Sequence, residues 1–279
     1  VMELLVTVDK KYLPPLQVML TSLYINNPEE DFEIYLIHSG LKEEEMEPLK
    51  RQCEGMGYRL FLIKTEEEYF EGAPVTKQYP REMYYRLLAP CFLPDRLMRI
   101  LYLDPDILVI NSLRSLWETD LEGKLFAAAA HTGKTNLANN INQVRLGTDN
   151  KYYNSGVLLM NLEQGRKEIR PDEIFAYSRE HARELLLPDQ DILNAVFGSR
   201  TRELDDFLWN YDARNYSTYL LRSGGICDMD WVMSHTGILH FCGRSKPWQS
   251  GYIHRFGILY KHYIQLNRRM CQRFESGPR

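Results

Sequence analysis

Residues 99–109 read RILYLDPDILV, an apolar run that leads into two acids with one proline between them. The apolar part predicts a buried strand over residues 99–103, with Asp104 and Asp106 directly after its carboxyl end. In extended chain the side chains of residues i and i+2 point the same way, so the two carboxylates share one side. Close carboxylates repel each other unless a cation lies between them, and Mg²⁺ or Mn²⁺ does this while leaving positions open for phosphate. A turn is the alternative, in which the acids cap loop amides and Pro105 fixes the bend.

A second segment of this kind lies near the end of the chain. Residues 238–241 predict another apolar strand, which carries His240, and Gly243 and Lys246 follow in the next loop. Glycine lets the backbone approach a ligand closely, and lysine offers a positive charge to a phosphate oxygen. A neutral imidazole suits Mn²⁺ as a third ligand. An isolated histidine would be interpreted as a hydrogen-bonded core residue, but the glycine and lysine beside it favour a ligand.

The pattern around these two segments is that of an α/β protein. Short apolar runs alternate with helical periodicity in the first half, which predicts βαβ units around a parallel sheet. We expect strands over residues 4–8, 32–38, 58–63, 99–103, 124–130, 156–162 and 238–241. We expect helices over residues 16–24, 42–54, 81–89, 171–186, 189–197 and 255–273, the third of them closed by Pro90. Residues 131–151 are asparagine-rich without apolar periodicity and predict a mobile loop over a site.

Composition excludes several classes of protein. The chain of 279 residues has no internal repeat or linker, so we expect a single domain. A formal net charge of −4 supplies no basic field, and we expect no nucleic-acid partner. The five cysteines are odd in number and form no CxxC pair, which favours a reducing, cytoplasmic setting over a disulfide framework or a zinc site. We expect neither a signal peptide nor a membrane-spanning segment, because no run of about 18 apolar residues occurs.

Six segments, taken in order, resemble the retaining glycosyltransferases of family 8, which include bacterial galactosyl- and glucosyltransferases of lipopolysaccharide synthesis and glycogenin. The segments are VTVD (6–9), YYRL (84–87), YLDPD (102–106), YNSGV (153–157), PDQDILN (188–194) and HFCGRSKPW (240–248). The resemblance covers nearly the whole chain and implies the GT-A fold, a Rossmann-like α/β domain with a mixed central sheet. It also implies a UDP-sugar as the donor, a glycan or glycolipid as the acceptor, and Mn²⁺ as the metal, with Mg²⁺ as the alternative.

The resemblance assigns the site residues as well. Asp104, Asp106 and His240 would bind Mn²⁺, which bridges the diphosphate of the donor. Asp9 would contact the uracil or the ribose, beside the backbone of Thr7 and Val8. The other donor contacts would come from Arg86, Pro105, Asn154, Ser155, Asp189 and Gln190 around the sugar and from Gly243 and Lys246 at the diphosphate. Residues 1–110 would then be the nucleotide-binding half, residues 111–250 the sugar and acceptor half, and residues 251–279 a helical segment.

The chain departs from the family pattern at two places. Lys10 and Lys11 follow the early aspartate, where the family often has a polar neutral residue that contacts the nucleotide. His131 stands where some members have an aspartate that contacts the sugar. The second departure leaves the choice between a glucose and a galactose donor open.

The family retains the anomeric configuration, which in hydrolases usually involves a carboxylate nucleophile. The resemblance places Gln190 beneath the sugar, and an amide oxygen is a poor nucleophile. Asp191 is the next carboxylate, but adjacent residues on a helix face about 100° apart. We therefore favour attack by the acceptor hydroxyl on the same face, with the donor phosphate taking the proton, and we name Gln190, Asp189 and Asp191 as catalytic candidates. The plain alternative for residues 189–191 is a helix N-terminus, where acids complement the macrodipole.

Acceptor contacts are less legible. The aromatic segment 207–211, with Tyr216 and Tyr219, offers stacking faces for a sugar ring, but aromatics of this kind are as common in cores. Residues 255–273 predict an amphipathic helix with one basic face, which could lie on the inner face of an anionic membrane. Docking of its apolar stripe on the core is the commoner arrangement, and we favour it.

Two other functions compete with glycosyl transfer. A phosphatase or phosphotransferase would use the two aspartates as nucleophile and acid, but that chemistry usually places them after the first strand, and it leaves the late histidine loop without a role. A UDP-sugar binding module without turnover would keep every proposed ligand. Hydrolysis of the donor separates this module from an enzyme.

Overall fold

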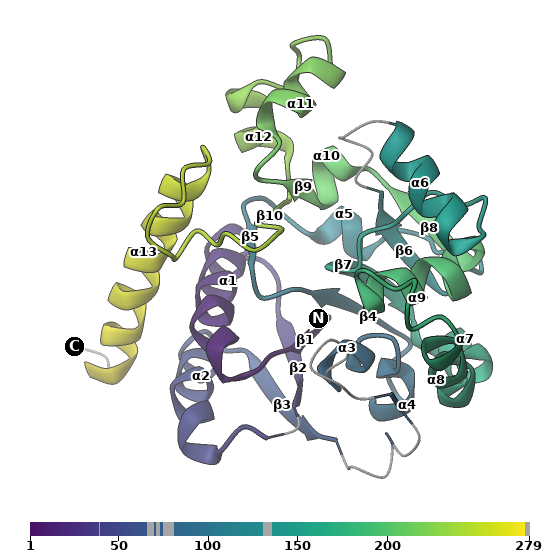
Figure 1. Cartoon of the computed structure of the whole chain (residues 1–279). Coiled ribbons are helices and arrows are strands. Elements are labelled where there is room, and N and C mark those ends of the chain that lie inside the picture. Colours follow the sequence, from purple (N-terminus) through teal and green to yellow (C-terminus); the bar gives the residue numbers. More distant parts are fainter. Residues whose placement is uncertain (39, 66–69, 71–72, 75–80, 131–135, 277–279) are drawn as a thin grey trace.

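The computed structural model describes residues 1–38, 40–65, 70, 73–74, 81–130 and 136–276. A seven-stranded sheet crosses the middle of the molecule in the order β3-β2-β1-β4-β7-β6-β8 (Figure 1). Its strands are β1 (Met2–Thr7), β2 (Phe32–His38), β3 (Arg59–Lys64), β4 (Arg99–Leu103), β6 (Phe126–Ala129), β7 (Val157–Asn161) and β8 (Thr201–Leu204). The first four pair in parallel, and β7 pairs antiparallel with both β4 and β6. The expected α/β fold with a mixed central sheet is confirmed.

Helices lie on both faces of this sheet. The helices are α1 (Leu13–Asn26), α2 (Glu43–Gly55), α3 (Glu82–Tyr85), α4 (Ala89–Phe92), α5 (Arg114–Trp117), α6 (Asn136–Leu146), α7 (Leu162–Glu168), α8 (Pro171–Glu180), α9 (Pro188–Phe197), α10 (Asp206–Trp209), α11 (Tyr216–Arg222), α12 (Met229–His235) and α13 (Gly257–Ser276), with 3-10 turns η1 (Lys10–Tyr12) and η4 (Gly198–Arg200). Of these, α11 and α12 pack with a smaller sheet, and α13 packs on α1 and α2. Alternate residues of β1 point to opposite faces, so Leu5 packs in one apolar core with α8 and α9, whereas Leu4 and Val6 pack in another with α1 and α2. Burial on both faces explains why the inner strands, such as β2 and β4, read as continuous apolar runs.

A second, three-stranded sheet has the order β5-β10-β9. It consists of β5 (Ile107–Val109), β9 (Tyr211–Asp212) and β10 (Ile238–His240). β10 pairs antiparallel with β5, which places His240 opposite Ile107. Because β5 follows β4 after three residues, the chain passes from the large sheet to the small one through Asp104 and Asp106.

Three expected elements differ in the structure. The helix predicted over residues 81–89 is two short helices, α3 and α4, and Pro90 lies in the first turn of α4 instead of closing a helix. Proline is tolerated in a first turn because its missing N–H would have no helical partner there. The helix predicted over residues 171–186 ends at Glu180. The loop predicted over residues 131–151 contains α6, and its first residues, 131–135, lie outside the described part of the chain.

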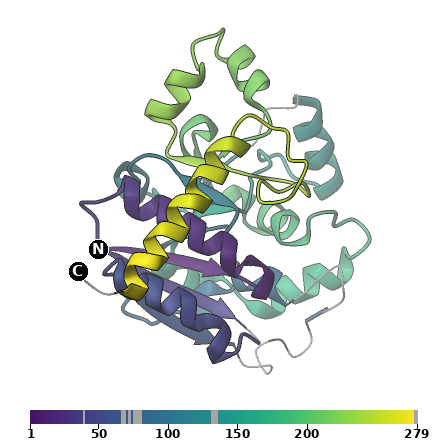
Figure 2. The ribbon, with the colours of Figure 1, turned by 90° about the vertical axis from the view of Figure 1, so that its left-hand side faces the viewer.

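The C-terminal helix α13 lies along α1 and α2 (Figure 2). Asn267 Oδ1 accepts hydrogen bonds from Thr21 Oγ1 at 2.9 Å and from Gln52 Nε2 at 3.0 Å. Tyr260 of α13 is fully buried. The expectation that this helix docks its apolar stripe on the core is confirmed. In the part of the chain that the structure describes, no helix combines the length and the apolar character that a membrane span requires.

The aromatic segment proposed for acceptor stacking also belongs to the core. Tyr211 and Tyr219 are buried, and their rings stack with centroids 4.0 Å apart. Phe207 and Tyr216 pack against the same apolar cluster. The core alternative is therefore the correct one for this segment. All five cysteines are free.

Candidate active site

The two aspartates lie at the junction of the two sheets. The backbone N–H of Asp104 donates to the carbonyl of Gly156 at 2.8 Å, which ties the end of β4 to the start of β7. The N–H of Phe241 donates to the carbonyl of Asp106 at 3.0 Å, so the ladder between β5 and β10 continues past His240. This pairing carries a residue from late in the chain to the two acids. The pairing of β5 with β10 therefore determines where the three side chains meet.

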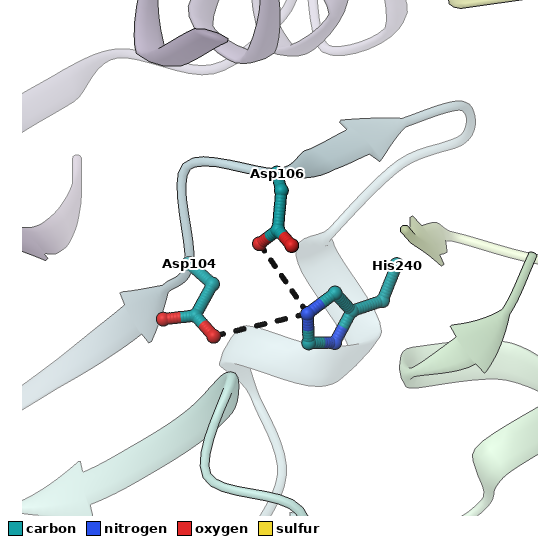
Figure 3. Close-up of side chains that lie close together, drawn as sticks. All are labelled: Asp104, Asp106 and His240. Carbon is teal, nitrogen blue, oxygen red and sulfur yellow. Dashed lines mark ion pairs between the residues drawn. The ribbon is translucent and has the colours of Figure 1, made fainter. Parts of the chain in front are cut away.

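Figure 3 shows the three side chains turned toward one another. His240 Nε2 lies 3.4 Å from Asp106 Oδ1 and 3.8 Å from Asp104 Oδ2. One possible ligand atom from each residue lies within 4.8 Å of the other two. Two carboxylates and an imidazole are ligands that suit Mn²⁺ and, for the oxygens, Mg²⁺.

The backbone beside this cluster leaves room for the ligand side chains. A Cβ on Gly156 would lie 2.7 Å from Asp104 Oδ2 and would overlap the His240 ring at Cε1. Any residue other than glycine would therefore displace two of the three side chains. The donor set and this glycine together fit a divalent cation.

A lysine balances the buried charge of the cluster. Lys246 forms an ion pair with Asp106 Oδ2 and donates to the carbonyl of Phe241 at 3.0 Å. Burial by itself would raise the pKa of Asp106, but His240 and Lys246 outweigh it and hold that pKa well below its usual range. Burial likewise lowers the pKa of Lys246, and Asp106 more than offsets this, so the ammonium stays charged. The site thus presents an ionised carboxylate at neutral pH.

Arg86 connects the other aspartate to α9. Its Nη1 lies 3.1 Å from Asp104 Oδ1 and 3.2 Å from Asp189 Oδ2, and it donates to the carbonyl of Ser155 at 3.1 Å. Its guanidinium carbon lies 4.6 Å from the centroid of the Tyr102 ring. The Tyr102 hydroxyl donates to Asp104 Oδ1 at 2.5 Å. Arg86 therefore holds the ends of β4 and α9 together.

The candidates on α9 have different surroundings. Asp189 accepts a hydrogen bond from Ser155 Oγ at 3.2 Å and also forms the ion pair with Arg86. Gln190 Oε1 accepts from Asn154 Nδ2 at 2.9 Å. Asp191 is fully buried and forms an ion pair with Arg145 of α6, with Nη2 and Oδ1 2.7 Å apart.

A cavity of about 540 Å³ opens beside the cluster. Its described lining residues are Thr7, Val8, Asp9, Tyr12, Glu82, Met83, Arg86, Asp104, Pro105, Asp106, Pro188, Asp189 and Lys246. Nine of the predicted site residues are in this set. Asn154, Ser155, Gln190, Asp191, His240 and Gly243 are not among the described lining residues. Of these, Asn154, Ser155, Gln190 and His240 contact lining residues or one another, whereas Asp191 turns away toward α6.

Four of the lining residues were not predicted as site residues: Tyr12, Glu82, Met83 and Pro188. The first three lie at helical spacings from predicted site residues and could have been found in that way. Asp9 Oδ1 accepts from the N–H groups of Lys11 and Tyr12 and so caps the 3-10 turn η1. In such a turn, side chains three residues apart eclipse, which puts Tyr12 on the side of Asp9. Glu82 and Met83 precede Arg86 by four and three residues, the spacing that places side chains on one helical face.

Gly243 has a backbone conformation that favours glycine. Its φ is +87°, and a Cβ there would overlap the guanidinium of Arg214. Arg214 is held by Asp212, with Nη2 and Oδ2 2.7 Å apart. The loop between His240 and Lys246 thus turns tightly and brings Lys246 back onto Asp106.

Comparison with known proteins extends over nearly the whole chain. General stress protein A of Bacillus subtilis is 28% identical over 272 residues, which cover 95% of this chain and 93% of that protein. A lipopolysaccharide 1,2-glucosyltransferase of Escherichia coli is 24% identical over 86% of this chain and 71% of its own length. A lipopolysaccharide 1,3-galactosyltransferase of Salmonella typhimurium is 22% identical over 87% of this chain and 72% of its own length.

The structure of the galactosyltransferase LgtC in complex with donor and acceptor sugar analogues superposes with a TM-score of 0.78 at 22% identity, covering 95% of this chain and 96% of that one. This likeness shows that the two share the GT-A fold. Residues 3–251 match the family model described as glycosyl transferase family 8. Since this match spans most of its 279 residues, the chain belongs to glycosyl transferase family 8.

Proposed function

We propose that this glycosyltransferase moves a hexose, glucose or galactose, from a UDP-sugar to a hydroxyl of a glycan or glycolipid, and that it depends on Mn²⁺, with Mg²⁺ as the alternative ion. The observation that carries the proposal is the position of Asp104 and Asp106. Both line one cavity with Lys246, while His240 faces them from the small sheet. The curated relatives named as glucosyl- and galactosyltransferases of lipopolysaccharide support a hexose and a glycolipid acceptor.

The diphosphate end of the donor would lie at this cluster. A divalent cation held by Asp104, Asp106 and His240 would act there as a Lewis acid on the departing diphosphate. Lys246 lines the same cavity, and its ammonium would balance the negative charge of the phosphate as well as that of Asp106. Gly243 would let the backbone of the loop approach the phosphate oxygens.

The uridine end of the donor would lie on the β1 side of the cavity. Thr7, Val8 and Asp9 line it at the end of β1, and Tyr12 lines it from η1. An aromatic ring offers a face on which a base can stack, and a carboxylate accepts from the ribose hydroxyls or the uracil N–H. Residues 1–110 would thus form the nucleotide-binding half, residues 111–250 the sugar and acceptor half, and residues 251–279 the helical segment that covers α1.

The reaction would take place on one face of the sugar. Asp189 is in the cavity but is held by Arg86, and Gln190 Oε1 is engaged by Asn154. Asp191 is fully buried against Arg145. These contacts favour roles in holding the sugar hydroxyls for Asp189 and Gln190, and a structural role for Asp191. The acceptor oxygen would form its bond to the anomeric carbon as the bond to the phosphate oxygen breaks, and the acceptor proton would pass to that phosphate oxygen.

The setting we propose is the cytoplasm, at the inner face of the membrane where a lipid-linked acceptor would be found. Lys261, Arg268 and Arg269 support this because they are exposed on α13 while the apolar stripe of that helix is covered by the core. Basic side chains on one exposed face attract an anionic lipid surface.

Calorimetric titration of UDP-glucose and UDP-galactose, first with Mn²⁺ and then with EDTA, tests the proposal. Asp106→Ala is the diagnostic variant, and Asp95→Ala is its matched control because the Asp95 side chain is fully exposed. We expect one sugar nucleotide to bind in the presence of Mn²⁺, to lose affinity with EDTA and in Asp106→Ala, and to bind normally in Asp95→Ala. Slow hydrolysis of the bound donor to free sugar and UDP would distinguish the enzyme from a binding module.

Failure of both nucleotides to bind with metal present would overturn the donor class. Binding without any hydrolysis or transfer, over a panel of glycan and glycolipid acceptors, would favour the module instead.

A further inference from the structure

A chain of side-chain amides links the two ends of the site. Asn210 Oδ1 lies 2.9 Å from His240 Nδ1. Asn210 Nδ2 donates to Asn154 Oδ1 at 2.9 Å, and Asn154 Nδ2 donates to Gln190 Oε1 at 2.9 Å. Asn210 belongs to none of the motifs in the sequence and is fully buried between α10 and β9.

The direction of this chain is fixed by a backbone group. The N–H of Gly156 donates to Asn154 at 3.0 Å, and since a backbone N–H can only donate, the atom it meets is the oxygen Oδ1. Asn210 must then offer its NH₂ to that same oxygen, which leaves its own oxygen for His240. An amide oxygen cannot donate, so the proton of this last hydrogen bond belongs to His240 Nδ1.

The consequence at the metal site concerns the histidine ring. Because its Nδ1 proton is held by Asn210, the imidazole can offer only Nε2 to a metal ion, and Nε2 gives up its own proton where it carries one. Nε2 is the atom that faces Asp106 Oδ1 at 3.4 Å and Asp104 Oδ2 at 3.8 Å. Partners of this kind, on the far nitrogen of a ligating histidine, set its tautomer and ring orientation.

The consequence at the other end concerns the sugar site. Because Asn154 turns its NH₂ toward Gln190, the Gln190 oxygen points at Asn154 and also accepts from the N–H of Ser155 at 3.4 Å. Gln190 is buried, and its side chain also forms a hydrogen bond with the side chain of Tyr152. The orientation of the Gln190 amide is therefore fixed by the same chain that fixes His240.

We propose that Asn210 is a positioning residue for both ends of the site: it holds the His240 proton on Nδ1 and, through Asn154, holds the amide of Gln190. The proposal rests on the proposed function in so far as His240 binds a metal ion. Asn210 touches neither the cavity nor the reacting atoms; it acts through the residues that it contacts.

Two substitutions separate the two roles of Asn210. Asn210→Asp keeps an oxygen acceptor for His240 Nδ1 but replaces the donor to Asn154 with a second acceptor. Asn210→Leu removes both partners at similar volume. Asn27→Leu is the matched control, because Asn27 is also buried and bridges α1 to the backbone N–H of Leu113 at 2.8 Å, away from the site.

The first measurement needs no metal. Proton–nitrogen correlation spectra of metal-free protein labelled with ¹⁵N in histidine should show a slowly exchanging Nδ1 proton for His240, identified by its loss in His240→Ala. We expect this proton to persist in Asn210→Asp and Asn27→Leu and to exchange rapidly in Asn210→Leu. An unprotonated Nδ1 on His240 in the wild-type protein would overturn the inference, and this result needs no Asn210 variant.

The second measurement is Mn²⁺ affinity, read from the electron paramagnetic resonance signal of free Mn²⁺, together with kcat. Loss of a partner of this kind typically weakens metal binding by about 10–100-fold, which we expect for Asn210→Leu. Asn210→Asp should keep the wild-type affinity while kcat falls, since Gln190 is no longer held. Equal Mn²⁺ affinity in the wild type and Asn210→Leu would refute the role of Asn210 without affecting the proposed function. Wild-type protein that binds no Mn²⁺ would refute the proposed function, and the spectra would then decide whether Asn210 holds the His240 proton.

Discussion

Substitution of Gly156 by alanine offers a sharp test of the site geometry. The new Cβ would lie 2.7 Å from Asp104 Oδ2, about 0.7 Å inside the 3.4 Å at which ordinary contact begins, and would overlap the His240 ring. Both side chains must therefore move. A misplacement of about 1 Å at a reacting site costs about 100-fold in rate, and we expect a loss of this size in kcat together with weaker Mn²⁺ binding.

The effect on stability should be much smaller. Overpacking of a buried site costs about 1–3 kcal/mol. Part of this is offset, because alanine in place of a glycine with an ordinary φ lowers the entropy of the unfolded chain by about 0.4–1 kcal/mol. We thus expect the free energy of unfolding to fall by about 1–2 kcal/mol, well below the typical stability of a domain.

The assays are Mn²⁺ titration, hydrolysis of the UDP-sugar and urea denaturation of the same preparations. Gly40→Ala is the matched control, because a Cβ at that exposed position meets nothing within 4 Å. Gly156→Ala that binds Mn²⁺ and turns over like the wild type would refute the assignment of Asp104 and His240 to one metal site. A fall in stability as large as the fall in activity would instead point to general damage.

Three further predictions concern stability and are measured by urea denaturation. Arg145→Met leaves the fully buried Asp191 without its cation and should lower the free energy of unfolding by about 3–5 kcal/mol. Lys151→Met, at a half-exposed ion pair, should change it by less than about 1 kcal/mol. Equal effects would contradict the greater importance of the buried pair. Tyr260→Ala on the covered face of α13 should cost about 3–5 kcal/mol and Ile258→Ala on its exposed face less than about 0.5 kcal/mol, so the reverse order would mean that α13 is not docked in solution. Mn²⁺ at 100 times its Kd should add about 2.7 kcal/mol, and EDTA should remove it; a midpoint insensitive to both would count against a metal site in the native protein.

Much of the fold followed from local pattern, and the exceptions have physical causes. The inner strands of the large sheet are buried on both faces, so their apolar runs marked them clearly. The edge strand β8 has the partly exposed Arg202 and the exposed Glu203 at its centre and was not predicted. The helix α6 carried no apolar period, because its anchor is the ion pair from Arg145 to Asp191, a contact that joins residues far apart in the sequence. Pro90 predicted a helix end but lies in the first turn of α4, since proline fits either place.

The site residues likewise fall into those that the sequence predicts and those that it does not. The two aspartates and His240 were predictable because they lie at or just after the end of an apolar strand, and the structure brings them together through the pairing of β5 with β10. Asn210 could not be found from sequence, because it lies among aromatic residues that mark a core, and its importance depends on which atom of each amide faces its neighbour. Tyr12 was within reach, had the 3-10 turn capped by Asp9 been recognised.

The cover that α13 provides for α1 has a consequence for biosynthesis. The hydrogen bond between Thr21 and Asn267 joins residues 246 positions apart. At about 5–20 residues per second, the ribosome needs roughly 12–50 s to produce the second partner after the first. During that interval the outer side of α1 and the nearby part of α2 are not covered by α13, and newly made chains must be prevented from aggregating through this surface. Premature termination before α13 would make this condition permanent, so nascent chains cut short at that point should be found with chaperones or in inclusion bodies.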